Sequence, residues 1–292
     1  MAKITVGVPV FNGAASLRAC LECLRDQTFR DLEVLISDNG SQDESVAIAQ
    51  AFVDSDPRFR LIRHPVNIGA KRNFMSVLEA ATSELFMWRA DDAWTDEYFI
   101  EKLHALFVAR PDLELGVPQV RIFHDHGGLW LVQPFEKSTA GNRGKRIGED
   151  MLKITPAVIY GLWRRDTLLA SMERTFAIFD AYAGWDHVVI FPSILDEKIA
   201  ADNTTELCYR TNPPRDNAAS ISAMEMFAVR NLFRRASLAA VHERKWTWLE
   251  RIYLEIYTRK YAARNIYRFS KTLRHLVRSS LGIQRKRRKR TA

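Results

Sequence analysis

The sequence has few cysteines and no long apolar run, and each absence excludes a class of protein. Its 292 residues include three cysteines, Cys20, Cys23 and Cys208, and so sparse and odd a set cannot form the disulfide framework of a small secreted protein. No stretch approaches the roughly 18 apolar residues that a membrane-spanning helix needs. The first residues turn polar too soon to form a secretory signal, so we expect a cytoplasmic protein.

Cys20 and Cys23 form a C-x-x-C motif, a spacing that occurs in metal and redox sites. They lie in SLRACLECLRDQ, where Leu17, Leu21 and Leu24 mark one face of a helix. Because no second C-x-x-C and no nearby His pair completes a zinc site, the motif predicts core packing.

Positive charge is concentrated at the C-terminal end. No acidic residue follows Glu255, and residues 259–292 hold 13 of the 43 lysines and arginines. The rest of the chain therefore contains 30 basic and 35 acidic residues. From 246 onward, apolar residues recur at helical spacing beside basic ones, a pattern typical of helices at an anionic membrane surface; RKRRKR (285–290) adds to that attraction. The alternative is a helix packed on the body with a solvated end. The tail lacks a recognition module for nucleic acid, and no nucleic acid partner is expected.

β-Branched segments alternate with amphipathic ones over the first 110 residues. The pattern predicts strands over 3–10, 32–37, 59–64 and 84–88, with helices over 14–26, 44–54, 70–81 and 95–109. Such alternation indicates a mainly parallel sheet covered by helices on both faces. Further on, we expect two strands joined at 124–128, a strand running into a helix over 157–168, a buried helix over 184–195, a short strand over 204–210, and helices from about 222.

The loops after Val10, Ser37, His64 and Trp88 should gather at one edge of this sheet, because ligands of such folds bind outside the carboxyl ends of the strands. These loops carry many short polar residues: Asn12, Asp38, Asn39, Asp43, Asn67, Arg89, Asp91 and Asp92.

Asp91 and Asp92 follow an apolar strand, where two carboxylates repel one another unless a cation or a proton compensates. Mg²⁺ or Mn²⁺ held by one or two carboxylates and the oxygens of a diphosphate would supply that charge. The alternative is that both acids cap a helix starting near Thr95.

Several motifs in this order resemble the family 2 glycosyltransferases, GT-A enzymes that transfer a sugar from a nucleotide-diphosphate sugar. The opening segment VGVPVFNGAASLRACLECLRDQTFRDLEVLISDNGSQDES, the segment NIGAKRNF and the aspartate motif WRADDAW carry the likeness. It is close over residues 3–110 and weaker to about 220. The resemblance implies a Rossmann-like GT-A catalytic domain over 1–220, with a nucleotide-sugar-binding half (1–110), an acceptor-binding half (111–220) and a helical extension (221–292).

The resemblance also implies roles for individual residues in binding the nucleotide sugar. Pro9 and Phe11 would line the base pocket, and Asp38 would accept a hydrogen bond from the base. Asp92 would be the direct metal ligand, with Asp91 supporting the ribose or the metal. The full set of implied donor-binding residues is Pro9, Phe11, Asn12, Asp38, Asn39, Ser41, Asn67, Gly69, Arg72, Arg89, Asp91 and Arg210.

Simpler local roles stay open for several of these positions. Asp38 can form an Asx turn, and Asn67 with Gly69 can form a loop and a helix cap. In the family an acid often stands where Arg89 stands here, so Arg89 would face phosphate or pair with Asp91. Arg215 is an alternative to Arg210 for stabilising the leaving diphosphate.

An inverting transfer needs a base for the acceptor hydroxyl, and the resemblance implies that Asp186 in GWDHVVI is this base. The alternatives are that Asp186 stabilises a helix N-terminus, or that Asp180 is the base. Trp185 would be a platform for the acceptor sugar or part of the core. HDH (124–126) has metal-like spacing, but Gly127 and Gly128 favour a hairpin tip.

The sequence therefore predicts a metal-dependent inverting glycosyltransferase that uses Mn²⁺ or Mg²⁺. Its acceptor would be a glycan or a lipid-linked precursor in cell-surface polysaccharide synthesis, and its location cytoplasmic, peripheral at the inner face of the plasma membrane if the tail binds lipid. The rivals are a catalytically degenerate nucleotide-sugar-binding protein, a nucleic-acid-binding module driven by the tail, and a nucleotidyltransferase. The last would carry a Gly-x-Gly-Thr-Arg loop, which VPVFNGAASL lacks.

Overall fold

The computed structural model describes residues 3–124, 127–179, 184–210 and 223–266. Asp180, Arg215, the last two residues of the HDH motif (125–126) and the basic run at 285–290 lie outside the described residues. The chain divides into two compact units. The first consists of Met1–Thr139 and Lys153–Pro213, and the second of Ala140–Leu152 and Pro214–Ala292.

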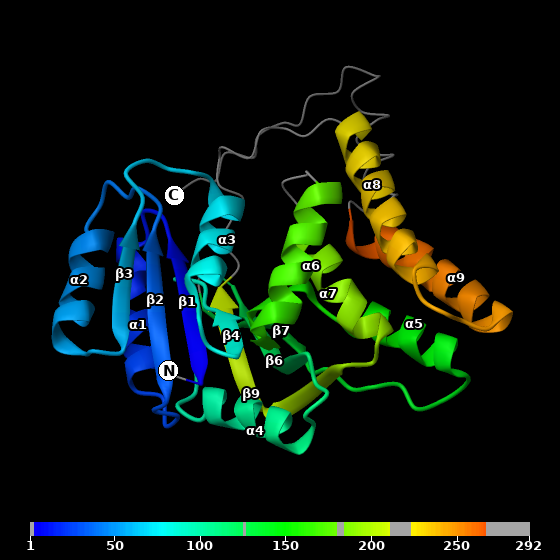
Figure 1. The fold of residues 1–292 in the computed structure, drawn as a ribbon, viewed down its shortest axis with the longest axis horizontal. Coiled ribbons are helices and arrows are strands. Elements are labelled where there is room, and N and C mark those ends of the chain that lie inside the picture. The colour runs from blue at the N-terminus through cyan, green and yellow to red at the C-terminus, as the bar shows by residue number, and fades with distance from the viewer. Residues whose placement is uncertain (1–2, 125–126, 180–183, 211–222, 267–292) are drawn as a thin grey trace. The chain divides into compact units, whose positions relative to one another are not determined.

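The first half of the first unit alternates strands and helices as predicted. Strands β1 (Ile4–Val10), β2 (Leu32–Asp38), β3 (Phe59–Arg63) and β4 (Leu85–Trp88) alternate with helices α1 (Ala14–Arg25), α2 (Ser45–Ser55) and α3 (Ala70–Ala80). The four strands are parallel and lie side by side in the order β3-β2-β1-β4 (Figure 1). Their carboxyl ends therefore meet at one edge, as expected.

The rest of the first unit extends the same sheet. It contains β5 (Trp94–Thr95), α4 (Phe99–Ala109), β6 (Leu115–Phe123), β7 (Leu129–Gln133), the 3₁₀ helix η1 (Pro156–Tyr160), β8 (Leu162–Arg164), α6 (Arg165–Ile178), α7 (Trp185–Leu195) and β9 (Ile199–Arg210). The sheet continues β4-β8-β6-β9-β5, with β7 beside β6. Since β8 is antiparallel to both β4 and β6, strand β6 runs in the direction of β4, and β9 is parallel to β6. The mainly parallel α/β sheet is confirmed.

Two boundaries differ from the prediction. The helix expected from residue 95 begins at Phe99, because Trp94 and Thr95 pair with Cys208 and Leu207 of β9. The strand expected over 204–210 starts at Ile199, since its first residues pair with β6.

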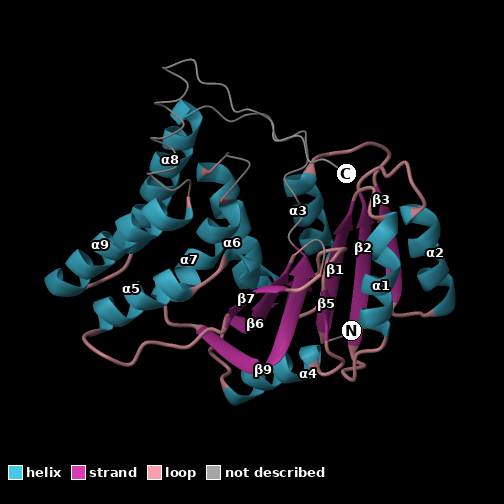
Figure 2. Ribbon diagram, turned by 180° about the vertical axis from the view of Figure 1, so that it is seen from behind, coloured by secondary structure: helices cyan, strands magenta, loops and turns pink. Residues whose placement is uncertain are grey.

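Helices cover both faces of this sheet. Figure 2 shows α1 in front of the strands, with α3 on the other face. Leu17, Cys20, Leu21 and Leu24 of α1 are buried in the core cluster, which confirms the packing predicted for this helix face. Burial raises the pKa of the Cys20 thiol to about 12, and Cys20 is therefore a protonated core residue.

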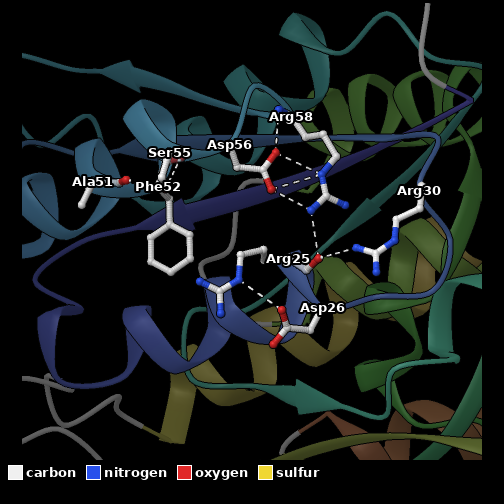
Figure 3. Close-up of polar contacts among 8 residues, drawn as sticks. All are labelled: Arg25, Asp26, Arg30, Ala51, Phe52, Ser55, Asp56 and Arg58. Atoms are coloured by element: carbon white, nitrogen blue, oxygen red, sulfur yellow. Dashed lines mark hydrogen bonds and ion pairs between the residues drawn. The ribbon is translucent and has the colours of Figure 1, made fainter.

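The C-terminal end of α1 is fastened by a cluster of arginines (Figure 3). The carbonyl oxygen of Arg25 accepts hydrogen bonds from Arg30 Nη1 at 3.1 Å and Arg58 Nη2 at 2.9 Å. Arg58 also bonds to Asp56 Oδ2 at 2.7 Å. Because the last carbonyls of a helix have no partner within it, these donors tie α1 to the turn between α2 and β3.

The second unit is helical and contains α5 (Arg143–Lys153), α8 (Ala223–His242) and α9 (Trp248–Asn265). The rings of Phe233 in α8 and Tyr261 in α9 lie 5.6 Å apart. Helix α5 approaches α9 closely, since a Cβ on Gly148 would come within 2.3 Å of the Tyr257 ring. None of the helices in the described ranges is long and apolar enough to cross a membrane.

Candidate active site

The loops after β1 and β2 are joined by hydrogen bonds at the carboxyl edge of the sheet. Asn12 has a φ of 51°, which turns its backbone N–H toward Ser41 Oγ at 2.9 Å, while its own Oδ1 accepts from Gln42 N at 2.8 Å. Asp43 Oδ2 accepts from Ala14 N at 3.0 Å, in the first turn of α1. These contacts fix the rim of the site through side chains that the sequence had placed there.

Asp43 is one of these rim residues, and the sequence assigned it no binding role. Although desolvation works in the opposite direction, hydrogen bonds from the Ser45 hydroxyl and from the backbone N–H groups of Ala14 and Ser45 lower the pKa of the Asp43 carboxyl. Its negative charge lies at the N-terminal end of α1, where a helix dipole favours it. Asp43 is thus a structural support of the rim.

Hydrogen bonds within and between two loops hold the side chains of Asp38, Asn39 and Asn67. Both carboxylate oxygens of Asp38, which is 2% exposed, lie 3.3 Å from Ser41 N, so the Asx-type turn left open by the sequence is present. Asn39 Nδ2 donates to Asn67 Oδ1 at 3.0 Å, and the same oxygen accepts from Gly69 N at 2.8 Å. The base-reading role of Asp38 stays a prediction beside this structural role.

The other residues expected to bind the nucleotide differ in exposure. Pro9 is buried in β1 and Phe11 is half-buried just beyond it. Gly69 has a φ of 86°, and nothing lies within 4 Å of a Cβ built on it, so the backbone there is open to a ligand. Arg72 is exposed on the first turn of α3. The structure brings these positions to one edge of the sheet, and their roles stay predictions.

Asp91 lies against the loop between β1 and α1. A Cβ built on Gly13 would come within 2.1 Å of Asp91 Oδ2, so only a glycine leaves room for this carboxylate. Gly13 is a site residue that the sequence did not reveal, because the approach joins segments almost eighty positions apart.

A cavity of about 240 Å³ brings Asp92 and Asp186 together. Asp92 enters it from the loop between β4 and β5, and Asp186 from the first turn of α7. Trp185, Tyr160 and Tyr209 also line it, with Ala90, Ala93, Pro156, Ala157, Ile159 and Leu207. Two carboxylates far apart in the sequence therefore line one partly open, partly apolar cavity.

Tyr160 and Tyr209 were not identified from the sequence. Burial and the nearby carboxylates of Asp186 and Asp92 raise the pKa of Tyr209 to about 12, and the same causes raise the pKa of Tyr160 further. Both phenols are therefore protonated at neutral pH and can donate hydrogen bonds into the cavity.

Asp186 lines the cavity and also accepts a hydrogen bond from the backbone of its own helix. Its Oδ1 accepts from His187 N at 2.9 Å, so the helix-terminal role left open by the sequence is also present. The Trp185 ring makes edge contacts with Phe74 and Phe176, at 5.7 and 6.2 Å between ring centroids. Trp185 is thus packed on one side and lines the cavity on the other.

Arg89 does not reach the site surface. Its side chain is 1% exposed, its Nη2 donates to Thr95 Oγ1 at 3.3 Å, and its guanidinium lies 4.9 Å from the centre of the Phe99 ring. Its Nε and Nη1 have no hydrogen-bond partner within the described chain. Arg89 is therefore an interior residue of the described chain, and its roles toward a phosphate or toward Asp91 stay predictions.

Arg210 ends β9 and is exposed, with its guanidinium 5.6 Å from the centre of the Trp94 ring. Trp94 in turn lies 5.4 Å from Phe123. The contact with Trp94 holds the Arg210 side chain against β5, and its phosphate-binding role stays a prediction.

The described residues contain no group of three or more His, Cys, Asp or Glu side chains placed to hold a metal ion. Two carboxylates, those of Asp91 and Asp92, are enough for Mg²⁺ or Mn²⁺. These ions bind one or two carboxylates and complete their coordination with phosphate oxygens and water. The pair thus suits a metal that arrives with a diphosphate.

A mainly parallel sheet with polar loops and two carboxylates at its carboxyl edge is the arrangement of the GT-A fold. The family model described as glycosyl transferase family 2 matches residues 5–159, just over half of the chain, and the chain belongs to that family.

Relatives and solved structures agree with this assignment. The chain is 30% identical to the uncharacterized glycosyltransferase YibD of Escherichia coli over 60% of this chain and 52% of that protein. It is 29% identical to the GalNAc(5)-diNAcBac-PP-undecaprenol beta-1,3-glucosyltransferase of Campylobacter jejuni over 32% and 30%. The chain therefore spans at most about half of these relatives.

Among solved structures, TarS of S. aureus in complex with UDP superposes with a TM-score of 0.66 at 14% identity, covering 92% of this chain and 73% of TarS. The mannosyltransferase PcManGT of Pyrobaculum calidifontis in complex with GDP-Man and Mn²⁺ superposes at 0.59 and 14%, covering 96% and 75%. These likenesses establish the fold.

Proposed function

We propose that this chain transfers a sugar from a nucleotide-diphosphate sugar to a hydroxyl of a glycan or lipid-linked acceptor, with inversion, in the synthesis of cell-surface polysaccharide. The observation that carries the proposal is the shared cavity of Asp92 and Asp186. The donor class is that of the ligands in the neighbouring structures, UDP and GDP-Man. The acceptor class follows the undecaprenol-linked substrate in the name of the Campylobacter relative.

In this proposal Asp92 and Asp91 hold the divalent cation, which offsets the charge of the diphosphate when bound. Asp186 accepts the proton of the acceptor hydroxyl. The oxygen of that hydroxyl forms a bond to the anomeric carbon, and the bond between this carbon and the diphosphate breaks. Attack from the face opposite the leaving group inverts that carbon. The phenols of Tyr160 and Tyr209, whose pKa values burial raises, serve as hydrogen-bond donors.

The proposal is tested by thermal unfolding with a panel of UDP and GDP sugars, with and without Mn²⁺. A ligand at about 100 times its Kd stabilises the fold by about 2.7 kcal/mol. Replacing Asp92 with Asn should remove the Mn²⁺-dependent part of the shift, whereas Asp112→Asn, at an acid with 63% of its side chain exposed, should keep it. If no nucleotide raises the melting temperature, the chain binds none of these donors and the proposed transfer fails.

A second assay measures the nucleotide that is released when an acceptor is present. Because sugar transfer to the acceptor releases it and donor binding alone does not, this assay distinguishes transfer from donor binding. A chain that binds the nucleotide sugar tightly but transfers nothing to any lipid-linked or glycan acceptor would support the rival, a catalytically degenerate binding protein.

A further inference from the structure

One face of α9 in the second unit is apolar and exposed. Trp248 is 75% exposed, Leu249 39%, Ile252 46% and Ile256 41%. At 100° per residue these four side chains fall on one side of the helix. We call them the α9 stripe.

The opposite side of α9 packs against the rest of the second unit. Leu254 and Thr258 are fully buried, and Tyr261 and Ala262 are nearly so, with Tyr261 against Phe233 of α8. Because α9 already has this buried face, the stripe is a second apolar surface that the folding of the unit does not explain. Large exposed apolar side chains grouped on one face are typical of an interaction site.

The charges around the stripe are positive. Helix α9 contains four basic and two acidic residues. Both acids are engaged, since Glu250 forms a capping box with Thr247 and Glu255 bonds to Arg251 and His242, each at 3.1 Å.

Two of the basic residues lie at the C-terminal end of the stripe. By helical angle Arg259 follows Ile252 and Ile256 on the same side, and Lys260 lies at its margin. Arg259 lies 3.9 Å from Glu255 Oε2 in an ion pair, and because 57% of its side chain is exposed its guanidinium can also reach an anion. Beyond Ile266 the sequence adds ten more lysines and arginines and no acid.

We propose that the α9 stripe docks the protein on an anionic lipid surface, with Trp248, Ile252 and Ile256 among the acyl chains and Arg259 and Lys260 at the phosphates. An apolar face beside basic residues is what binds a helix in the plane of such a surface, and tryptophan favours the boundary between lipid and water. The positive charge argues against a second copy of this chain and against its own basic tail as the occupant. The docking surface is independent of the proposed transfer activity.

The test uses the full chain and vesicles of phosphatidylcholine with about a third phosphatidylglycerol, compared with pure phosphatidylcholine. We expect binding to the anionic vesicles, measured by co-sedimentation. Ile252→Gln with Ile256→Gln should weaken it about tenfold or more, because insertion scales with buried apolar area. Ile178→Gln, at a 43% exposed isoleucine of α6, should bind as wild type, and circular dichroism verifies that each variant is folded.

Depth is measured separately with lipids brominated on the acyl chains, which quench nearby tryptophans. Trp248→Phe should keep vesicle binding but lose most of the quenching. The matched control Trp130→Phe, at a tryptophan that is 54% exposed in β7, should keep both.

Three results would overturn the proposal. The first is that the double glutamine variant binds vesicles as wild type does, while deletion of residues 267–292 abolishes binding. The tail alone would then bind the vesicles. The second is quenching unaffected by Trp248→Phe. The third is a dimer in solution, seen by light scattering without lipid, that the double variant dissociates.

Discussion

At the scale of single residues, Asp186 has two roles that one substitution can separate. Asp186→Asn keeps the shape and the oxygen that accepts from His187 N, but an amide cannot take a proton at neutral pH. We expect kcat to fall by about 10²- to 10⁴-fold, with the donor Kd changed by less than about twofold. Single-turnover transfer and calorimetric donor binding measure the two quantities.

Asp166→Asn is the matched control, since Asp166 also lies in the first turn of a helix, α6. It loses the same interaction with a helix N-terminus and should keep full activity. Equal losses in the two variants would mean that Asp186 acts only on its helix.

Gly13 gives a second prediction at this scale. Gly13→Ala places a methyl group where Asp91 Oδ2 now lies, without backbone strain, because φ at Gly13 is −104°. We expect the donor and Mn²⁺ to bind about tenfold or more weakly, while the melting temperature changes by only a few degrees.

Gly148→Ala is the comparison for Gly13→Ala. Its methyl group would meet the Tyr257 ring at 2.3 Å in the second unit, so it should lower the melting temperature and leave donor affinity unchanged. Unchanged donor affinity in Gly13→Ala would show that Asp91 is not needed in its present position.

At the scale of elements, the arginine cluster of Figure 3 makes a prediction about stability and pH. Arg58→Met removes the partner of Asp56 and a donor to the Arg25 carbonyl. We expect the free energy of unfolding to fall by about 1–3 kcal/mol. Arg60→Met, in an ion pair whose Arg60 side chain is 62% exposed, should cost under about 1 kcal/mol.

The pH dependence has a definite sign. The hydrogen bond from Arg58 lowers the pKa of Asp56 from its ordinary 3.8, so this contribution is present above about pH 4 and is lost as pH falls through the lower folded pKa. Chemical denaturation between about pH 5 and pH 3 should therefore show a shallower loss of stability in Arg58→Met than in wild type. Parallel curves would contradict the assignment.

Elements that local periodicity determines were predictable from the sequence. Strands β1, β2 and β4 and helix α7 are nearly continuous buried runs, and α1 repeats its buried leucines at helical spacing. Strand β5 was missed because two residues carry no period, and only pairing with β9 defines it. Helix α5 was missed because Gly144, Gly148 and Asp150 stand on its buried face, which leaves only Ile147 and Met151 to mark that face as apolar. The same limit applies to the site, where Asp92 was predicted but Tyr209 and Gly13 depend on tertiary approach.

At the scale of the molecule, the second unit takes α5 from the middle of the sequence. The predicted boundary at 220 stays a prediction, but a chain cut there keeps α5 and loses α8 and α9. In the full chain Ile147 and Met151 of α5 are 1% and 0% exposed, and a Cβ on Gly144 would meet the backbone of Glu250 at 2.6 Å.

Exposing Ile147 and Met151 costs about 1.5–3 kcal/mol each, so we expect a chain ending at residue 220 to bind a hydrophobic dye and to aggregate. A chain ending at Ile266 keeps all of α9, whereas a cut at 259 would remove its last turns. The chain ending at Ile266 should unfold at the temperature of the full chain, measured by calorimetry at equal concentration. A soluble 1–220 chain that binds no dye would mean that α5 folds without α9, and the division into two units would then not describe how the chain is stabilised.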